Sequence, residues 1–283
     1  MDLTTWSDAM LFSTVLIETE LDDGEVKTGT GFFYFRRVRQ SEGQEILVTN
    51  RHVVEGGRRI TVWFHEADSE ARPKLGEIGR VSTDQSNWRF HPDPKVDVAF
   101  MLMEPLDRDL QKSGYAVYRR NVNHRAIPTP EQLETTFPIE DVTVVGYPNG
   151  LYDEGNYLPI VRKGITATSL QVDYNHKPMF LISASVFPGS SGSPVYLHDP
   201  VSYGSRRGFE LSPRLWFLGV VAEFKYREAK GWFEFDDQPI LRAKVASQEA
   251  LDLGVVFKER TIREALDHHL IANGHPPDDP ARA

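Results

Sequence analysis

Short apolar runs separated by turn-forming residues dominate this sequence, and helical periodicity appears only near the C-terminal end. Such runs predict antiparallel strands joined by turns, which is typical of an all-β sandwich or barrel. We expect strands at 12–20, 28–35, 45–49, 59–64, 96–103, 142–145, 160–167, 179–186, 192–197, 215–224 and 253–257. We expect long loops at 66–88, 151–157, 198–213 and 225–249.

A polar connection at residues 105–132, with prolines at its end, divides these strands into two groups. We therefore expect three units: an N-terminal barrel at 8–130, a C-terminal barrel at 131–260, and a helix with a tail at 261–283. Thr261 and Glu264 have the spacing of a capping box. Apolar residues at helical spacing follow, which predicts a helix from about 262 to 273.

Composition excludes several classes of function. The 283 residues carry a net charge of −9, which argues against a nucleic-acid binder or a protein bound to acidic membranes. Cysteine is absent, so there is neither a disulfide framework nor a cysteine–metal site. The start has no basic segment followed by a long apolar one, and no apolar run approaches the roughly 20 residues that span a bilayer. We expect a cytoplasmic protein without a membrane anchor.

The segment from Phe187 to Tyr196 carries the most specific chemistry. A strand enters a turn of glycines, serines and prolines there, and another strand leaves it. Such a turn can present a serine hydroxyl beside several backbone N–H groups, as acyl transfer requires. The nucleophile elbow of α/β-hydrolases, Gly-x-Ser-x-Gly, is the rival interpretation, but Ser193 occupies the place of its second glycine. Pro194 then begins an apolar run instead of a helix.

Two residues at strand ends are candidate partners of Ser191. His52 follows the apolar strand at 45–49, whereas the other eight histidines lie beside polar or loop residues or in the terminal helix and tail. Asp97 opens the apolar run at 97–100, where a carboxylate is costly unless it has a partner. Asp93 lies between two prolines in a turn, where aspartate is common for local reasons.

These segments together resemble the chymotrypsin-fold, trypsin-like serine proteases over about residues 12–258. Gly189-x-Ser-Gly-Ser-Pro194 is similar to the family's nucleophile motif, and the order His52, Asp97, Ser191 is the chymotrypsin order. Asn50 and Arg51 stand where the family usually has two alanines before the histidine. The absence of cysteine and the serine at 193 resemble the bacterial glutamyl endopeptidases and the protease part of PDZ-containing periplasmic proteases.

The resemblance implies a fold and a set of roles. The fold would be two antiparallel six-stranded β-barrels, with a C-terminal helix added. Ser191 would be the nucleophile, His52 its general base and Asp97 the carboxylate that orients the histidine. The N–H groups of Gly189 and Ser191 would form the oxyanion hole.

The substrate pocket is less well defined. The resemblance places Ser185, six residues before the nucleophile, at the base of the pocket. It also places Ala222, Glu223 and Phe224 on the strand that pairs with the peptide main chain. Because the trypsin-type aspartate is missing at 185, we expect no preference for Arg or Lys and favour small or medium apolar residues. Glu223 could give the pocket a negative charge, or Phe224 could narrow it.

We expect a serine endopeptidase that acts on a polypeptide substrate and requires neither a metal nor another cofactor. We also expect narrow specificity or control by an unlinked regulatory protein partner, because broad proteolysis would be dangerous in the cytoplasm. Ser190 precedes the nucleophile where activated relatives carry an aspartate, so we expect no proteolytic activation. The alternative is a catalytically silent protease fold that binds a peptide.

Overall fold

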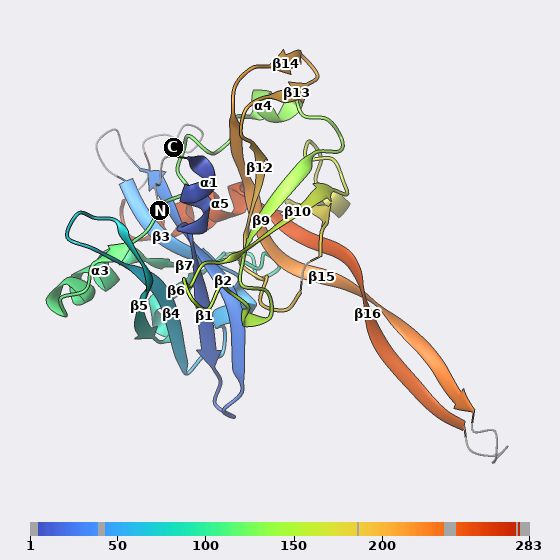
Figure 1. Ribbon diagram of the computed structural model, residues 1–283, viewed down its shortest axis with the longest axis horizontal. Helices are drawn as coiled ribbons and strands as arrows, with labels where there is room; N and C mark the ends of the chain where they lie inside the picture. The colour runs from blue at the N-terminus through green and yellow to red at the C-terminus, as the bar shows by residue number, and fades with distance from the viewer. Residues whose placement is uncertain (1–4, 39–42, 186, 235–241, 276, 278–283) are drawn as a thin grey trace.

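The computed structural model describes residues 5–38, 43–185, 187–234, 242–275 and 277. The described strands form an eight-stranded sheet, a closed six-stranded barrel and a small two-stranded sheet. Figure 1 shows the sheet and the barrel side by side, with a long two-stranded arm that extends away from the barrel. No described helix is long and apolar enough to cross a membrane.

The first sheet has the order β5-β4-β1-β2-β3-β7-β6, and β8 pairs with β4. Its strands are β1 (Thr14–Glu20), β2 (Val26–Arg37), β3 (Gly43–Thr49), β4 (Arg59–Ala67), β5 (Pro73–Thr83), β6 (Trp88–Phe90), β7 (Ala99–Leu102) and β8 (Val117–Tyr118). The helices of this half are α1 (Trp6–Leu11), α2 (Arg51–Val54), the 3₁₀ turn η1 (Gln85–Asn87) and α3 (Met103–Lys112).

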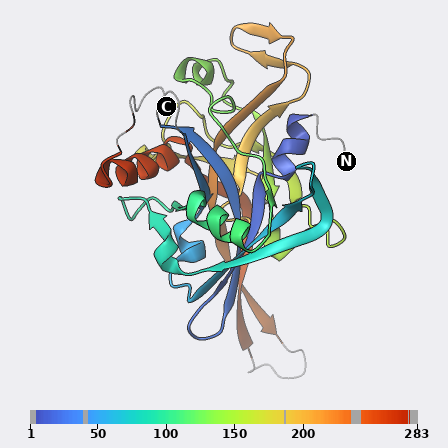
Figure 2. The same cartoon turned by 90° about the vertical axis from the view of Figure 1, so that its left-hand side faces the viewer.

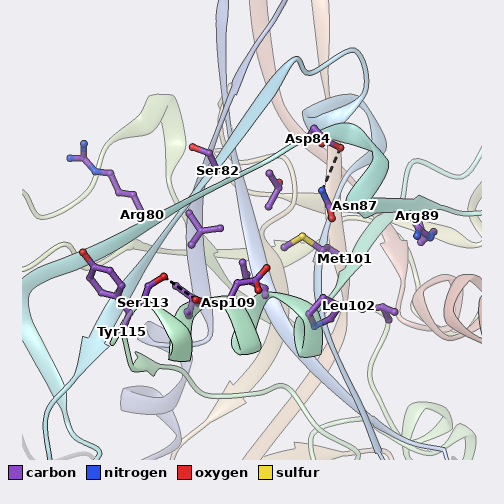
Figure 3. A pocket seen from close by; sticks show the side chains of 15 residues that line it. Arg80, Ser82, Asp84, Asn87, Arg89, Met101, Leu102, Asp109, Ser113 and Tyr115 are labelled. Carbon is purple, nitrogen blue, oxygen red and sulfur yellow. Dashed lines mark hydrogen bonds between the residues drawn. The ribbon is translucent and has the colours of Figure 1, made fainter.

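The expected first six-stranded barrel is wrong, because this sheet has eight strands and is open between β5 and β6. The two edge strands do not pair, and α3 packs over the sheet near them (Figure 2). Leu106 and Leu110 of α3 are buried in the same apolar cluster as Trp88 and Met101. A cavity of about 630 Å³, lined from β5, η1, β7 and α3, remains beside the helix (Figure 3). Burial against a helix therefore replaces the lateral hydrogen bonds that would close the barrel.

The second half forms the closed barrel, in the order β10-β11-β16-β15-β12-β9. Its strands are β9 (Asp141–Gly146), β10 (Ile160–Thr166), β11 (Met179–Ser183), β12 (Pro194–Asp199), β15 (Arg214–Glu234) and β16 (Arg242–Lys258), and β13 (Tyr203–Ser205) pairs with β14 (Gly208–Glu210) outside it. The remaining helical elements are α4 (Pro130–Glu134), η2 (Pro148–Gly150), η3 (Tyr174–His176) and α5 (Arg260–Ala272).

Four sequence expectations about individual elements need correction. The predicted loops at 66–88, 198–213 and 225–249 contain β5, the hairpin of β13 and β14, and most of the two-stranded arm of β15 and β16. The C-terminal helix exists, but it begins at Arg260 and is not capped by Thr261. The Thr261 hydroxyl donates instead to the carbonyl of Lys258 at 2.9 Å, because Thr261 already lies inside the first turn.

An apolar cluster joins the two halves and fixes their relative position. Phe32 and Tyr34 of β2 pack with Phe217 of β15, with ring centroids 5.3 and 6.2 Å apart. Residues of the first sheet, the barrel and α5 share this cluster. The elements that carry His52, Asp97 and Ser191 are therefore held by a common core.

Candidate active site

The turn that carries Ser191 lies between β11 and β12 and contacts both halves of the molecule. Gly192 has φ +87°, and a Cβ atom there would overlap the carbonyl oxygen of Thr30. The N–H of Gly192 donates to Val221 O at 2.8 Å, and the N–H of Thr30 donates to Ser191 O at 2.8 Å. Because the first sheet and the barrel both approach the backbone so closely, only glycine fits at 192.

The Ser191 side chain is buried, with 5% of the residue exposed. Its hydroxyl donates to the carbonyl oxygen of Ala222 at 3.3 Å. Ala222 lies on β15, so the expected substrate strand runs directly beside the serine. The geometry brings together two of the predicted site residues from segments 31 positions apart.

His52 and Asp97 form a close pair. His52 belongs to the short helix α2 that begins where β3 ends, and Asp97 lies two residues before β7. The His52 Nδ1 and Asp97 Oδ2 atoms are 2.6 Å apart, and the backbone N–H of His52 donates to Asp97 Oδ1 at 3.0 Å. A carboxylate can only accept, so this contact places a proton on Nδ1 and leaves Nε2 unprotonated in neutral histidine. The structure thus brings these two predicted site residues into direct contact.

Neither side chain of the His52–Asp97 pair is fully buried. The side chains of His52 and Asp97 are 49% and 27% exposed. Among the described residues, no hydrogen bond joins His52 to Ser191, whose hydroxyl contacts Ala222 instead. The structure therefore brings His52 and Asp97 together and leaves the serine hydroxyl turned to a backbone carbonyl.

Asp93 has the local role that its turn predicts. Its Oδ1 atom accepts the N–H of Lys95 at 2.9 Å, two residues along the chain. The backbone N–H of Asp93 is accepted by His91 Nδ1 at 3.0 Å. These contacts stay within the turn, so the geometry favours Asp97 as the partner of His52.

Asn50 stands where the family usually has an alanine, and the sequence alone assigns it no role in the site. It is fully buried, and its side-chain amide donates to the backbone carbonyl of Asp97 at 2.6 Å. Arg51 contacts Glu55 at 2.7 Å and lies 4.8 Å from the centre of the Phe90 ring. Asn50 thus ties the segment before His52 to Asp97. A polar residue directly after an apolar strand is the sequence signal for this contact.

Two backbone donors of the turn remain available. Gly189 has φ +84°, and a Cβ atom there would come within 2.5 Å of the Tyr147 carbonyl oxygen. In the described part of the chain, the N–H groups of Gly189 and Ser191 make no hydrogen bond. Two free backbone donors close to a serine hydroxyl are what an oxyanion hole needs.

The expected pocket residues differ in their surroundings. Ser185 is exposed at the end of the segment that follows β11, and its carbonyl accepts a hydrogen bond from Arg162 at 2.9 Å. The carboxylate of Glu223 is 62% exposed and lies 3.2 Å from Lys225 Nζ. Phe224 packs against the apolar cluster inside the barrel. Ala222 lies in a bulge of the pairing of β15 with β16, between Val221 and Glu223.

No metal site accompanies this arrangement in the described residues. Histidine, aspartate and glutamate side chains do not gather there in groups of three or more that could hold an ion.

The chain is similar to known proteases. Among solved structures it matches the active form of the Rv3671c protease from M. tuberculosis, with 19% identity, a TM-score of 0.45, and coverage of 92% of this chain and 82% of that chain. It also matches the HtrA-type protease AlgW with tripeptide, with 16% identity, a TM-score of 0.44, and coverage of 93% and 62%. No curated protein matches the sequence.

The family follows from the sequence match itself. The model of the trypsin-like peptidase domain matches residues 29–200, which is more than half of the chain. The matched range includes His52, Asp97 and Ser191. The chain therefore belongs to the trypsin-like peptidase domain family.

Proposed function

We propose that this protein is a serine endopeptidase with Ser191 as nucleophile, His52 as general base and Asp97 as the residue that orients His52. The observation that carries the proposal is the double contact of Asp97 with the ring and the backbone of His52. That contact fixes the ring and its tautomer, so that Nε2 is the available base.

The reaction begins when the Ser191 hydroxyl leaves the carbonyl of Ala222 and turns toward His52. Oγ attacks the carbonyl carbon of the scissile peptide bond while its proton passes to Nε2. The carbonyl oxygen becomes an oxyanion, which the N–H groups of Gly189 and Ser191 stabilise. The C–N bond then breaks, and His52 gives its proton to the leaving amine.

The acyl-enzyme is an ester of Ser191. Water, deprotonated by His52, attacks the ester carbonyl, and the proton returns to Oγ as the acid product leaves. Asp97 stays ionised and accepts the hydrogen bond from His52 Nδ1–H throughout, which stabilises the imidazolium that forms in each half-reaction. The side chains required are all present in this chain.

The alternative function is a catalytically silent domain that binds a peptide. The hydrogen bond from Ser191 to Ala222 favours this alternative, because a serine held by a backbone carbonyl is not activated. In that case the β15 strand would hold a peptide by main-chain pairing without cleaving it.

A fluorophosphonate probe separates the two functions, because it reacts with an activated serine and spares an inert one. We expect the probe to label the wild-type chain once, at Ser191, and to leave Ser191→Ala unlabelled. His52→Ala should also lose labelling while keeping the folded far-UV spectrum. Absence of labelling in the wild type, together with binding of a peptide, would favour the silent domain.

We also propose that a separate protein regulates this peptidase. The strand that carries Ala222 continues directly into the two-stranded arm, which leaves the barrel (Figure 1). An isolated two-stranded hairpin is only marginally stable in water, so contact with another surface would stabilise it. A bound protein at the arm would therefore act on the same strand that contacts Ser191. Labelling rates measured with and without cell extract test this part of the proposal.

A further inference from the structure

Arg162 lies on β10 with its side chain directed to the inner side of the barrel. It pairs across the sheet with Val144 of β9, and directly paired residues project from the same face. Val144 is buried in the apolar cluster inside the barrel. The neighbours Val161 and Lys163 are exposed, whereas Arg162 is only partly so. The alternation places a positive charge at an inward-facing position.

The guanidinium lies against the segment that leads to the nucleophile turn. Its Nη1 donates to the carbonyl of Ser185 at 2.9 Å. Its central carbon lies 4.8 Å from the centre of the Phe187 ring. Ser185 is the residue that the family resemblance places at the base of the substrate pocket. Arg162 therefore brings a cation to that base from a neighbouring strand.

Arg162 has no carboxylate partner among the described residues, unlike other enclosed arginines of the chain. Arg214 contacts Glu140 at 2.8 Å and Asp199 at 2.6 Å. Arg119 contacts two carboxylates in the same way. For Arg162, only a carbonyl accepts a hydrogen bond, and its Nε is buried with no partner in the described chain.

A partly buried cation without a counter-ion carries a desolvation cost, and a ring face offsets only part of that cost. A carboxylate beside Arg162 would supply the missing acceptors, because guanidinium and carboxylate groups match in geometry. Glu223 does not serve this purpose, since its carboxylate is exposed beside Lys225. The missing acid can therefore come from a bound substrate.

We propose that Arg162 is a specificity-determining residue, and that the enzyme prefers to cleave after a residue with a carboxylate side chain. This inference rests on the proposed serine endopeptidase function and replaces the apolar preference expected from Ser185 alone. The substrate carboxylate enters above Ser185 and binds the guanidinium, which also holds the Ser185 carbonyl.

The test uses peptides that differ only at the cleaved position, which carries Glu, Gln, Leu or Arg. Gln has nearly the shape of Glu without its charge, so the Glu/Gln ratio of kcat/KM isolates the effect of charge. We expect a ratio of about 10 to 100 for the wild type, as for a hydrogen bond between charged groups. Arg162→Gln should bring the ratio close to one and leave cleavage of the Gln peptide within a few-fold. Lys163→Gln, on the exposed face, is the matched control and should keep the wild-type ratio.

Arg162→Lys keeps the charge and covers the case in which Arg162→Gln does not fold. We expect it to retain preference for Glu, with lower kcat/KM because the forked geometry is lost. A wild-type ratio near one, with clear turnover and probe labelling, would overturn this inference and leave the endopeptidase proposal standing. A uniform loss for all peptides in Arg162→Gln, with an unchanged ratio, would also overturn it, because Arg162 would then only brace the segment. Failure of the endopeptidase proposal is distinct, since neither turnover nor labelling would then occur with any peptide.

Discussion

Replacing Asp97 by asparagine changes one atom of the candidate site and two of its hydrogen bonds. In the wild type both carboxylate oxygens accept, one from the backbone N–H of His52 at 3.0 Å and one from its ring at 2.6 Å. Asparagine offers one oxygen and one NH₂ group. The backbone N–H cannot become an acceptor, so the amide oxygen must face it and the NH₂ group must face Nδ1.

The consequence is a change of tautomer. With a donor opposite it, Nδ1 must carry a lone pair, and the ring proton moves to Nε2. His52 then has no lone pair to receive the Ser191 proton. A wrong tautomer of this kind lowers kcat by roughly 10⁴-fold. At 1.36 kcal/mol for each factor of ten, this loss corresponds to about 5 kcal/mol in the activation barrier.

The stability effect should be much smaller than the effect on the barrier. The shape of the side chain is kept, and the contact with the backbone survives, so about 1–2 kcal/mol of hydrogen-bond energy is at risk. A chain of this size should lose only a few degrees in Tm. The contrast between a large kinetic loss and a small thermal shift identifies a role in orienting His52.

Peptide turnover, probe labelling and thermal unfolding of the same preparations provide the assay. Asp93→Asn is the matched control, because Asp93 accepts only from its own turn and should stay within a few-fold of the wild type. If Asp97→Asn retains more than about a tenth of wild-type kcat, the tautomer argument is wrong. If Asp93→Asn shows the larger loss, the carboxylate has been misassigned.

Three further changes test how the site is supported. Gly192→Ala forces a left-handed backbone on alanine, at about 1–2 kcal/mol, and adds an overlap with the Thr30 carbonyl; we expect loss of probe labelling and a lower urea midpoint. Tyr152→Ala removes a ring stacked on Tyr157, so probe labelling should slow while the Tm changes little. Arg214→Met leaves Glu140 buried without its cation, and urea unfolding should show a loss of about 3–5 kcal/mol.

The contact of His52 with Asp97 was predictable because both residues lie at the ends of apolar strands. β3 and β7 pair side by side, with Thr49 opposite Ala99, so residues just beyond those ends must meet. The strands could also be predicted from local apolar runs, and the turn role of Asp93 from the prolines on either side of it. Their roles in catalysis remain predictions until the assays above are done.

The sequence could not show whether the first sheet closes into a barrel. Closure depends on pairing between two edge strands, which no local sequence pattern reveals. The sequence predicts a loop in place of β5 because glycines and charged residues interrupt its apolar residues, and only Gly79 of this edge strand is buried. The arm was missed because a hairpin is held by backbone hydrogen bonds, which need no alternation of apolar residues. The apolar side of α3 then covers the gap that the unpaired edges leave.

The position of the Arg162 guanidinium beside Ser185 could not be predicted from the sequence either. Val161, Arg162 and Lys163 together resemble the outer face of an exposed strand. Which of the two cations points inward depends on register with β9, and a shift by one residue would exchange their faces. The pairing of Arg162 with Val144 settles that choice, and no local pattern could have done so.

The nucleophile turn is ordered by neutral hydrogen bonds from three directions. The buried Ser190 hydroxyl accepts the N–H of Phe187 at 3.3 Å, in the place where activated relatives use an aspartate. Asn149 donates its N–H to Pro188 O at 2.5 Å, and the Thr30 hydroxyl donates to Gly189 O at 2.9 Å. No buried charge takes part in these contacts, so we predict that no ammonium released by chain cleavage is needed to complete them, and probe labelling of the intact chain tests this.

The support from Asn149 links the turn to the first sheet through aromatic packing. The loop that follows Asn149 places Tyr152 and Tyr157 against Trp63 of β4, with ring centroids 6.3 and 6.4 Å apart. The guanidinium of Arg80 also lies over that tryptophan ring, 3.9 Å from its centre. This packing supports the segment whose Asn149 N–H holds the Pro188 carbonyl. If Ser191 acts as proposed, its hydroxyl must turn away from the Ala222 carbonyl. Because Ala222 lies on the strand predicted to receive the peptide, we expect substrate pairing to act on that same carbonyl.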